Sequence, residues 1–159
     1  QKNVSLQKGK RKPRGAQLVV IQTPEGPLHL VNWHLGLAEG ERRWQVHYLL
    51  NHDLFHVSKD LPTLVAGDFN DWRNTLSRLR FRLHRFEQIT APTRRFRSFP
   101  AFCPVASLDK VFRRGPIRIR HAGVVKSRLT RRASDHLPLV VDFSVEMAAP
   151  LPPSFWNGF

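Results

Sequence analysis

A small set of carboxylate, amide and imidazole side chains stands at the ends of apolar runs, where strands are expected to start or stop. The set consists of His34, Asp68, Asn70, Asp109, Asp135 and His136. Side chains at strand ends converge on the edge of a sheet, which is where α/β proteins hold ligands. Carboxylates and imidazoles together can activate water, move a proton or hold a cation. The pattern therefore indicates one polar site shared by all six.

Four of these residues also have a purely structural explanation. Asp68 could close an ordinary Gly-Asp turn, Asp135 could cap a turn, and His34 could be a hydrogen-bonded core histidine. Asp109 lies within an apolar run, where an unpaired carboxylate is costly, so it needs a partner, which could be an arginine. Together these explanations require four polar residues to reach strand ends for unrelated reasons, in a chain with only 12 acidic residues. We therefore favour the shared site.

The spacing of apolar residues indicates the elements that must position this site. Strands are predicted at residues 17–22, 28–34, 61–66, 105–112, 117–121 and 137–145. The first two are joined by T-P-E-G-P, which predicts a hairpin. One amphipathic helix is predicted over residues 41–57, and a short helix with Asp71 near its N-cap and Leu79 on its apolar side is expected further on. The fold class is therefore α/β or α+β.

Composition and charge limit the class of protein and its partners. The chain has 26 Lys and Arg against 12 Asp and Glu, a formal net charge of +14, which attracts polyanions such as phosphate-bearing ligands. The alternative is that the basic residues serve solubility alone. A hydrophobic content of 41% argues against disorder, and no apolar run reaches the roughly 20 residues of a membrane helix. With Cys103 as its one cysteine, the chain has no intramolecular disulfide and no multi-cysteine zinc site.

The two ends of the sequence differ from its middle. We expect residues 1–13 to be a basic flexible segment, residues 14–147 the folded domain, and residues 148–159 an irregular tail rich in proline and aromatic residues. The sequence starts at Gln1 without Met and without an apolar signal core, which we interpret as an interior cut or a processed end. We expect a cytoplasmic protein.

Four motifs, in this order, resemble those of one superfamily. They are N-W-H-L at 32–35, G-D-F-N-D at 67–71, L-D-K-V-F at 108–112 and S-D-H-L-P-L at 134–139. Over residues 14–146 the chain is similar to the endonuclease/exonuclease/phosphatase superfamily with the DNase I fold, especially to bacterial members of unsettled substrate. The resemblance implies an α/β fold that is the second half of a four-layer α/β/β/α sandwich, with one mixed sheet and flanking helices.

The resemblance implies a role for each polar residue. Asp68 matches the base that orients water, and Asn70 matches the amide that positions water, phosphate or metal. Asp135 matches a carboxylate ligand of a hard cation, most often Mg²⁺ or Mn²⁺.

Other residues match groups that act on the phosphate itself. His136 matches the phosphate-contacting histidine, and Asp109 matches the carboxylate that fixes its ring and favours its charged form. His34 matches a second histidine that donates to phosphate or to the leaving oxygen. Family loops before the Asp109 strand border the substrate groove, which implies substrate contacts for Arg94, Arg95 and Arg97.

The implied function is that of a divalent-metal-dependent phosphodiester hydrolase. Nucleic acid is the favoured substrate because basic stretches flank the motifs, while phospholipid head groups and inositol phosphates are other substrates of the superfamily. The alternative is a basic module that binds nucleic acid or an anionic surface without catalysis. A third interpretation is an interaction protein whose exposed sheet face recruits a partner.

One departure from the family pattern concerns the metal. The chain resembles only the second half of family members, and the first half supplies the glutamate that is the main metal ligand. No glutamate of this chain stands in that context at a strand end; the candidates are Glu25, Glu39, Glu41, Glu87 and Glu146. Without that half as its intramolecular partner, we expect the chain to be weakly active or inactive and to expose an apolar sheet face.

Overall fold

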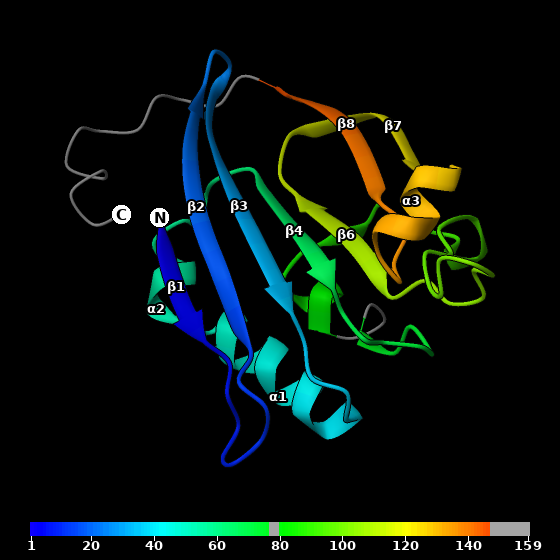
Figure 1. Cartoon of the computed structure of the whole chain (residues 1–159). Coiled ribbons are helices and arrows are strands. Elements are labelled where there is room, and N and C mark those ends of the chain that lie inside the picture. Colours follow the sequence, from blue (N-terminus) through cyan, green and yellow to red (C-terminus); the bar gives the residue numbers. More distant parts are fainter. Residues whose placement is uncertain (77–79, 147–159) are drawn as a thin grey trace.

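The computed structural model describes residues 1–76 and 80–146, so the expected tail at 148–159 and Leu79 lie outside the described residues. The larger sheet has the strand order β1-β2-β3-β4-β6-β5 (Figure 1). Its strands are β1 (Lys2–Ser5), β2 (Gly15–Thr23), β3 (Gly26–His34), β4 (Thr63–Asp68), β5 (Glu87–Gln88) and β6 (Asp109–Arg114). The other elements are α1 (Glu39–Leu50), α2 (Asp53–His56), the 3₁₀ turn η2 (Thr93–Arg95), β7 (Ile117–Val124), α3 (Arg128–Ala133) and β8 (Leu139–Val145). The α/β fold class is confirmed.

The N-terminal half of the large sheet contains the predicted hairpin and one strand that was not predicted. β2 and β3 pair antiparallel, with Thr23 opposite Gly26 at the turn. The expectation of a flexible segment at 1–13 is wrong for Lys2–Ser5, because these residues pair with β2 as strand β1. Val4 and Leu6 are 5% and 0% exposed. Two apolar side chains among the basic residues therefore anchor the segment to the core.

One face of the large sheet carries the main core and is covered by α1. The core on this face joins the sheet to the helix through Leu18, Val31, Trp33, Val46, Leu49 and Phe69. The single helix predicted at 41–57 is instead two helices, α1 and α2. The break comes at His52, which has an extended backbone and whose ring accepts the N–H of Leu54, capping α2.

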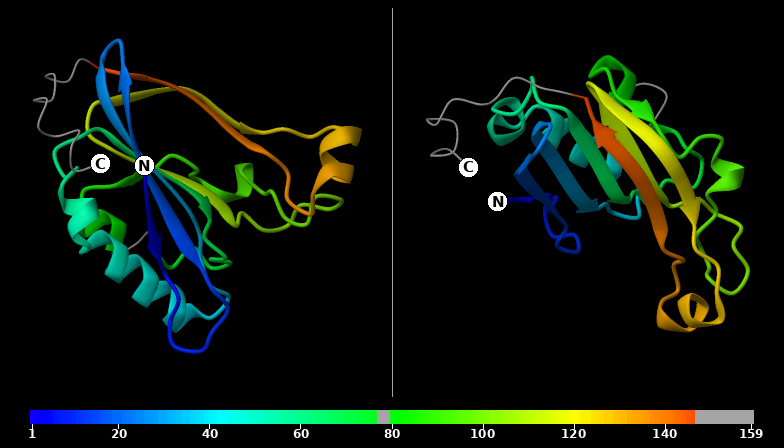
Figure 2. Two further views of the ribbon diagram at one scale, coloured as in Figure 1. Left: turned by 60° about the vertical axis from the view of Figure 1, so that its left-hand side comes forward. Right: turned by 90° about the horizontal axis from the view of Figure 1, so that it is seen from above.

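The second face of the large sheet is covered in part by β7 and β8, on the side opposite α1 (Figure 2). The expectation of one sheet is therefore corrected, because β7 and β8 form a separate two-stranded sheet. The chain turns onto this face directly after β6, at Gly115, whose φ of 83° favours glycine. The two sheets enclose a second, smaller core of Leu28, Leu64, Val111, Ile117 and Val145.

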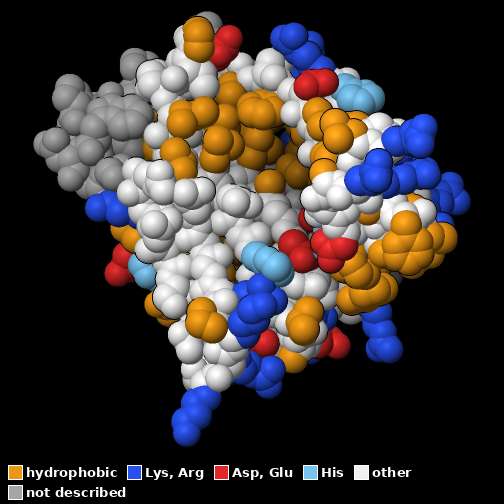
Figure 3. All heavy atoms as spheres, in the orientation of Figure 1, with side chains coloured by type: hydrophobic (Ala, Val, Ile, Leu, Met, Phe, Trp, Pro, Cys, Tyr) orange, Lys and Arg blue, Asp and Glu red, His pale blue; other side chains and the backbone are white. Residues whose placement is uncertain are grey.

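Apolar side chains remain at the surface beside this smaller core. Figure 3 shows hydrophobic side chains gathered over the upper centre of the face, where β3, β4 and β8 lie in Figure 1. Leu30, Val141 and Phe143 pack against the core while staying partly exposed. None of the helices in the described ranges is long and apolar enough to cross a membrane.

Candidate active site

Three strands of the large sheet bring polar residues to the same edge. β3 and β4 are parallel, so their last residues, His34 and Asp68, are partners in the register. β6 runs antiparallel to β4, which places its first residue, Asp109, opposite Asp68. The strand register alone therefore gathers an imidazole and two carboxylates at one place.

A fourth side chain, His136, reaches this edge from the segment between α3 and β8. Its Nδ1 lies 2.8 Å from Asp109 Oδ2, and its Nε2 lies 4.0 Å from Asp68 Oδ2. Backbone hydrogen bonds fix the segment, since Leu137 N–H donates to Ser98 O at 2.9 Å and Ala101 N–H donates to the carbonyl of Asp135 at 2.7 Å. The expected pairing of Asp109 with His136 is present.

Ser98 also holds the Asp109 carboxylate. Its hydroxyl donates to Asp109 Oδ2 at 2.5 Å, the same oxygen that contacts His136. Ser98 is fully buried, and its carbonyl also holds the His136 segment as described above. One serine therefore positions both members of the Asp109–His136 pair.

The environment of His136 favours its charged form. Burial lowers the pKa of this imidazole, but the hydrogen bond to Asp109 and the negative charges of Asp109, Asp68 and Asp135 outweigh burial and raise the pKa above its usual value. An imidazolium so held can donate a proton or a hydrogen bond to an anion through Nε2, because Nδ1 is occupied.

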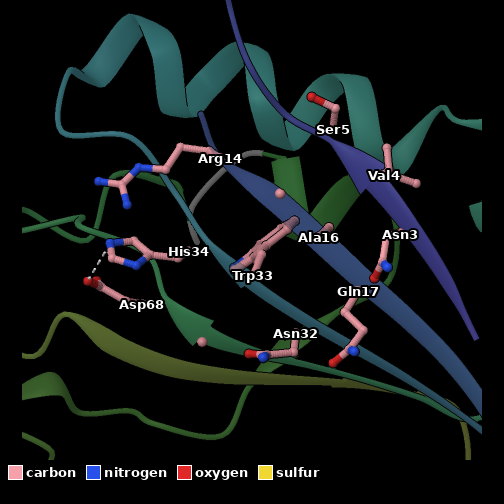
Figure 4. A pocket seen from close by; sticks show the side chains of 12 residues that line it. Asn3, Val4, Ser5, Arg14, Ala16, Gln17, Asn32, Trp33, His34 and Asp68 are labelled. Atoms are coloured by element: carbon pink, nitrogen blue, oxygen red, sulfur yellow. Dashed lines mark ion pairs between the residues drawn. The ribbon is translucent and has the colours of Figure 1, made fainter. Parts of the chain in front are cut away.

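The second histidine, His34, is in a different electrostatic environment. Its Nε2 lies 3.3 Å from Asp68 Oδ2. Burial lowers the pKa of His34, and although Asp68 opposes the shift, the positive charges of Arg14, His136 and Lys12 reinforce it. Figure 4 shows Arg14 beside the His34 ring in a pocket of about 740 Å³ that Asp68 also lines. The pKa values of the two histidines thus shift in opposite directions, as in paired acid and base groups.

Asn70 is held in place by its own turn. Its φ of 49° is left-handed, and its backbone N–H donates to Asp68 Oδ1 at 2.8 Å. Its side-chain amide donates to the carbonyl of Leu35 at 2.8 Å. Asp68 is therefore fixed through one oxygen by the turn, and its other oxygen faces both histidines.

A buried ion pair stabilises the chain directly after this turn. Asp71 and Lys110 are each 1% exposed, with Lys110 Nζ 3.3 Å from Asp71 Oδ2 and 2.7 Å from the Asp71 carbonyl. The carboxylate also accepts the N–H groups of Thr75 and Leu76, as expected of a residue near an N-cap. Burial raises the pKa of Asp71. The charge of Lys110 and these hydrogen bonds together lower it by more, so the pKa lies below its usual value.

All six of the predicted site residues line one pocket of about 460 Å³: His34, Asp68, Asn70, Asp109, Asp135 and His136. Trp72, Phe99, Leu37 and Leu108 complete its walls. The three predicted arginines are not part of it. Arg94 and Arg97 line a separate small pocket, and Arg95 lines neither pocket. The six residues thus share one pocket, and two of the three arginines line a neighbouring one.

These residues do not by themselves complete a metal site. Within residues 1–76 and 80–146 there is no group of three or more His, Cys, Asp or Glu side chains arranged to hold a metal ion. No glutamate is among the lining residues of this pocket, and Asp135 stands as an exposed carboxylate at its rim. Mg²⁺ needs only one or two protein carboxylates when water and substrate supply its other ligands. The pocket thus contains carboxylates, but the described residues do not form a complete cation site.

Several site residues were missed by the sequence reasoning. Lys110 lies within the L-D-K-V-F motif and Trp72 directly follows G-D-F-N-D, so their position in the sequence was a usable signal. Ser98 and Arg14 had no such signal, because each reaches the site through tertiary contacts with distant strands. Phe99, whose ring centre is 4.8 Å from that of His136, was equally hidden.

Comparison with known proteins identifies the family. The sequence model of the Endonuclease/Exonuclease/phosphatase family matches residues 4–136. The uncharacterized protein YbhP of Escherichia coli K12 is 33% identical over 119 residues, which are 70% of this chain and 44% of YbhP. The chain thus spans less than half of this curated relative.

Solved structures share the fold at low sequence identity. The mannosyl-6-phosphatase Bt3783 of Bacteroides thetaiotaomicron is 17% identical with a TM-score of 0.71, covering 90% of this chain and 65% of that one. TDP2 of D. rerio, complexed with a single-strand DNA product, is 16% identical with a TM-score of 0.66, covering 91% and 66%. The extent of the family match and the shared DNase I-like fold lead to one conclusion: this chain belongs to the endonuclease/exonuclease/phosphatase family.

Proposed function

We propose that this chain carries the catalytic residues of a phosphodiester hydrolase. The observation that carries the proposal is the place of His136, held by Asp109 on one nitrogen and facing Asp68 with the other, in a pocket that all six predicted residues line. Carboxylates that can activate water, next to histidines that can donate to a phosphate, suit the cleavage of a phosphoester.

In the proposed reaction, Asp68 aligns a water molecule and accepts its proton. Asn70 keeps the Asp68 carboxylate in one orientation through its backbone N–H. The neutral form of His34, 3.3 Å from Asp68, offers a donor to the phosphate or to the leaving oxygen. The proton that Asp68 takes from water passes through His34, 3.3 Å away, to the leaving oxygen, so the two side chains at the ends of β3 and β4 share the proton transfer.

His136 is proposed to bind a phosphoryl oxygen. Asp109 fixes the ring through Nδ1 and stabilises its positive charge, and Ser98 fixes Asp109. Nε2–H then donates to the phosphoryl oxygen as negative charge develops. Asp109 and Ser98 act on the reaction through His136, so we assign them positioning roles.

We further propose that the activity depends on Mg²⁺ or Mn²⁺, with Asp135 as one carboxylate ligand. A bound divalent cation would offset charge on the phosphoryl oxygens. Because the described residues do not form a complete cation site, we expect weak activity from the isolated chain. Titration calorimetry with Mn²⁺ alone tests the ligand, since Asp135→Asn should weaken Mn²⁺ binding by roughly tenfold or more.

The proposed substrate is a phosphate diester, with nucleic acid favoured over phospholipid or inositol phosphate. The net charge of +14 supports a polyanion. Among proteins with this fold, TDP2 was solved with a single-strand DNA product, whereas Bt3783 is named for a sugar phosphate. The fold therefore leaves the choice to this chain's own residues.

The test is hydrolysis of bis(p-nitrophenyl) phosphate with Mg²⁺ or Mn²⁺, in the gene product expressed from its own start codon and in the 159-residue chain. Asp68→Asn and His136→Gln should each lower kcat on the order of a hundredfold in the former, and Arg43→Gln, on the outer helix α1, should not. Rates that survive both site substitutions would contradict the proposal. Strong, Asp68-dependent turnover by the 159-residue chain would contradict the expected weak activity.

A non-catalytic binding module is the second candidate, favoured by the incomplete cation site and the basic charge. Salt-sensitive DNA binding that ignores Asp68→Asn and His136→Ala, with no turnover in either protein, would select it.

A further inference from the structure

A second, smaller pocket lies beside the candidate active site. It has a volume of about 150 Å³, against about 460 Å³ for its neighbour, which is too small for an organic ligand of ordinary size but suits a compact ion. Arg94 and Arg97 line it, both with exposed side chains. From the sequence, Arg94, Arg95 and Arg97 were all expected to contact substrate, but only Arg94 and Arg97 line this pocket.

The lining of this small pocket favours an anion. In the described part of the chain, no carboxylate pairs with Arg94 or Arg97. The one carboxylate in the wall, Asp71, is already neutralised by Lys110 and bonded to two backbone N–H groups. Ser107 also lines the wall, is 9% exposed, and its buried hydroxyl has no hydrogen-bond partner. Two arginines without a carboxylate partner, next to a serine whose buried hydroxyl is unsatisfied, suit the binding of a phosphate group.

An aromatic side chain joins the two pockets. Trp72 lines both of them and is 60% exposed. Its ring contacts Phe99 edge-on at 5.8 Å, and Phe99 in turn contacts His136 at 4.8 Å between ring centres. Apart from this edge contact, the exposed part of the Trp72 ring faces solvent between the two pockets. Exposed aromatic rings next to cationic grooves are platforms on which unpaired bases stack.

We propose that Arg94 and Arg97 form a second phosphate subsite, and that Trp72 stacks a base of a single-stranded nucleic acid whose neighbouring phosphates occupy the two pockets. The proposal rests on the proposed function of the larger pocket and deepens it by naming the substrate class. It also explains why the two anion-binding pockets share an aromatic wall.

The test is binding of short thymidine oligonucleotides by fluorescence anisotropy, without divalent cations so that nothing is cleaved. The dinucleotide has one internal phosphate and the trinucleotide has two. The wild-type chain should bind the trinucleotide roughly tenfold more tightly. The double substitution Arg94→Gln with Arg97→Gln should remove that gain and leave dinucleotide binding unchanged. Arg95→Gln, from the same 3₁₀ turn, is the charge-matched control and should keep the gain.

Two further ligands separate stacking and phosphate spacing. Trp72→Ala should weaken trinucleotide binding roughly tenfold, and an abasic trinucleotide should not respond to it. Thymidine diphosphate, whose two phosphates are contiguous, should bind independently of Arg94 and Arg97. If binding of the diphosphate were weakened by loss of Arg94 and Arg97, the proposed spacing between the two phosphate subsites would be wrong.

The outcomes distinguish this proposal from the proposed function. An equal loss with Arg95→Gln, or an unchanged gain in the double variant, would overturn the second subsite and indicate a diffuse basic surface. Dinucleotide binding that is unchanged by His136→Gln would instead contradict the proposed role of the candidate active-site pocket. Thermal unfolding of each variant checks that the fold persists.

Discussion

At the scale of single residues, the site depends on which groups share Asp68 and Asp109. Asp109 has one oxygen bound by both Ser98 and His136, and Asp68 faces His34 and His136. The surrounding carboxylates favour a proton on His136, while burial and nearby cations disfavour one on His34. The division of labour between the two histidines therefore comes from their neighbours.

Asp109→Asn should lower the pKa of His136. The amide has no negative charge to stabilise the imidazolium, whereas burial continues to disfavour it. An NMR titration of the imidazole resonances measures the change. Ser98→Ala, which keeps the charge on Asp109, is the control and should leave the pKa raised. A His136 pKa that does not move in Asp109→Asn would show that this pairing is electrostatically unimportant.

His29 should make the stability of the chain depend on pH. It is fully buried, its Nδ1 lies 2.9 Å from the Ser58 hydroxyl, and burial with the charge of Arg114 lowers its pKa from 6.5 to about 3. Below pH 6.5 His29 binds a proton in the unfolded chain, whereas in the folded chain it stays neutral until the pH approaches 3. Stability is therefore complete above this value and falls as the pH drops toward 3, with about 1.4 kcal/mol lost per pH unit at most.

Urea unfolding between pH 7 and pH 4 measures this dependence. His29→Gln keeps a hydrogen-bonding side chain but cannot titrate, so its stability should fall less steeply across the same window. Parallel curves for the wild type and the variant would mean that other groups account for the acid sensitivity.

At the scale of elements, the decisive contact is the close approach of β4 to β3. Gly67 has a φ of 139°, and a Cβ placed there would lie 2.0 Å from the carbonyl oxygen of Trp33. Only glycine therefore allows the register that sets Asp68 opposite His34. The glycine of the G-D-F-N motif serves the site by allowing two strands to meet.

Gly67→Ala should lower the free energy of unfolding on the order of 3 kcal/mol, because a strained φ and a steric clash occur together. Gly40→Ala is the matched control. It lies in α1 with open space around its Cβ, and there alanine should be neutral or slightly stabilising. Thermal or urea unfolding compares the two, and equal stabilities would contradict the clash.

At the scale of the whole molecule, two surface features stand out: the positive net charge and a sheet face that is only partly covered. Basic side chains give the long-range attraction to polyanions, whereas the paired site residues give chemistry at one edge. Partly exposed apolar residues beside the smaller core, such as Leu30 and Phe143, show that β7 and β8 cover the second face of the large sheet only in part.

The affinity for single-stranded DNA should therefore fall steeply with salt. With the two proposed phosphate contacts, raising the salt from 50 to 200 mM should weaken binding roughly sevenfold. Anisotropy titrations with a 20-nucleotide strand measure the slope. A peptide nucleic acid of the same sequence has no backbone charge and should show no such slope. A flat response with DNA would mean that the net charge plays no part in recognition.

The sequence by itself determined the hairpin of β2 and β3, the buried strand β4, the α/β class and the six residues that line the candidate active-site pocket. Those features are local, since apolar alternation marks strands and polar residues at strand ends mark their edge. It also misled locally. Val4 and Leu6 were overlooked among basic neighbours, and the apolar period ran through His52, where a cap divides the predicted helix.

Only the tertiary structure decided which residues meet. The support of both Asp109 and His136 by Ser98, the separate sheet of β7 and β8, and the position of Arg94 and Arg97 in one pocket with Ser107 all join segments that lie apart in the chain. Spacing along the sequence carries no information on such contacts, because they depend on how strands are ordered and where loops cross the sheet edge.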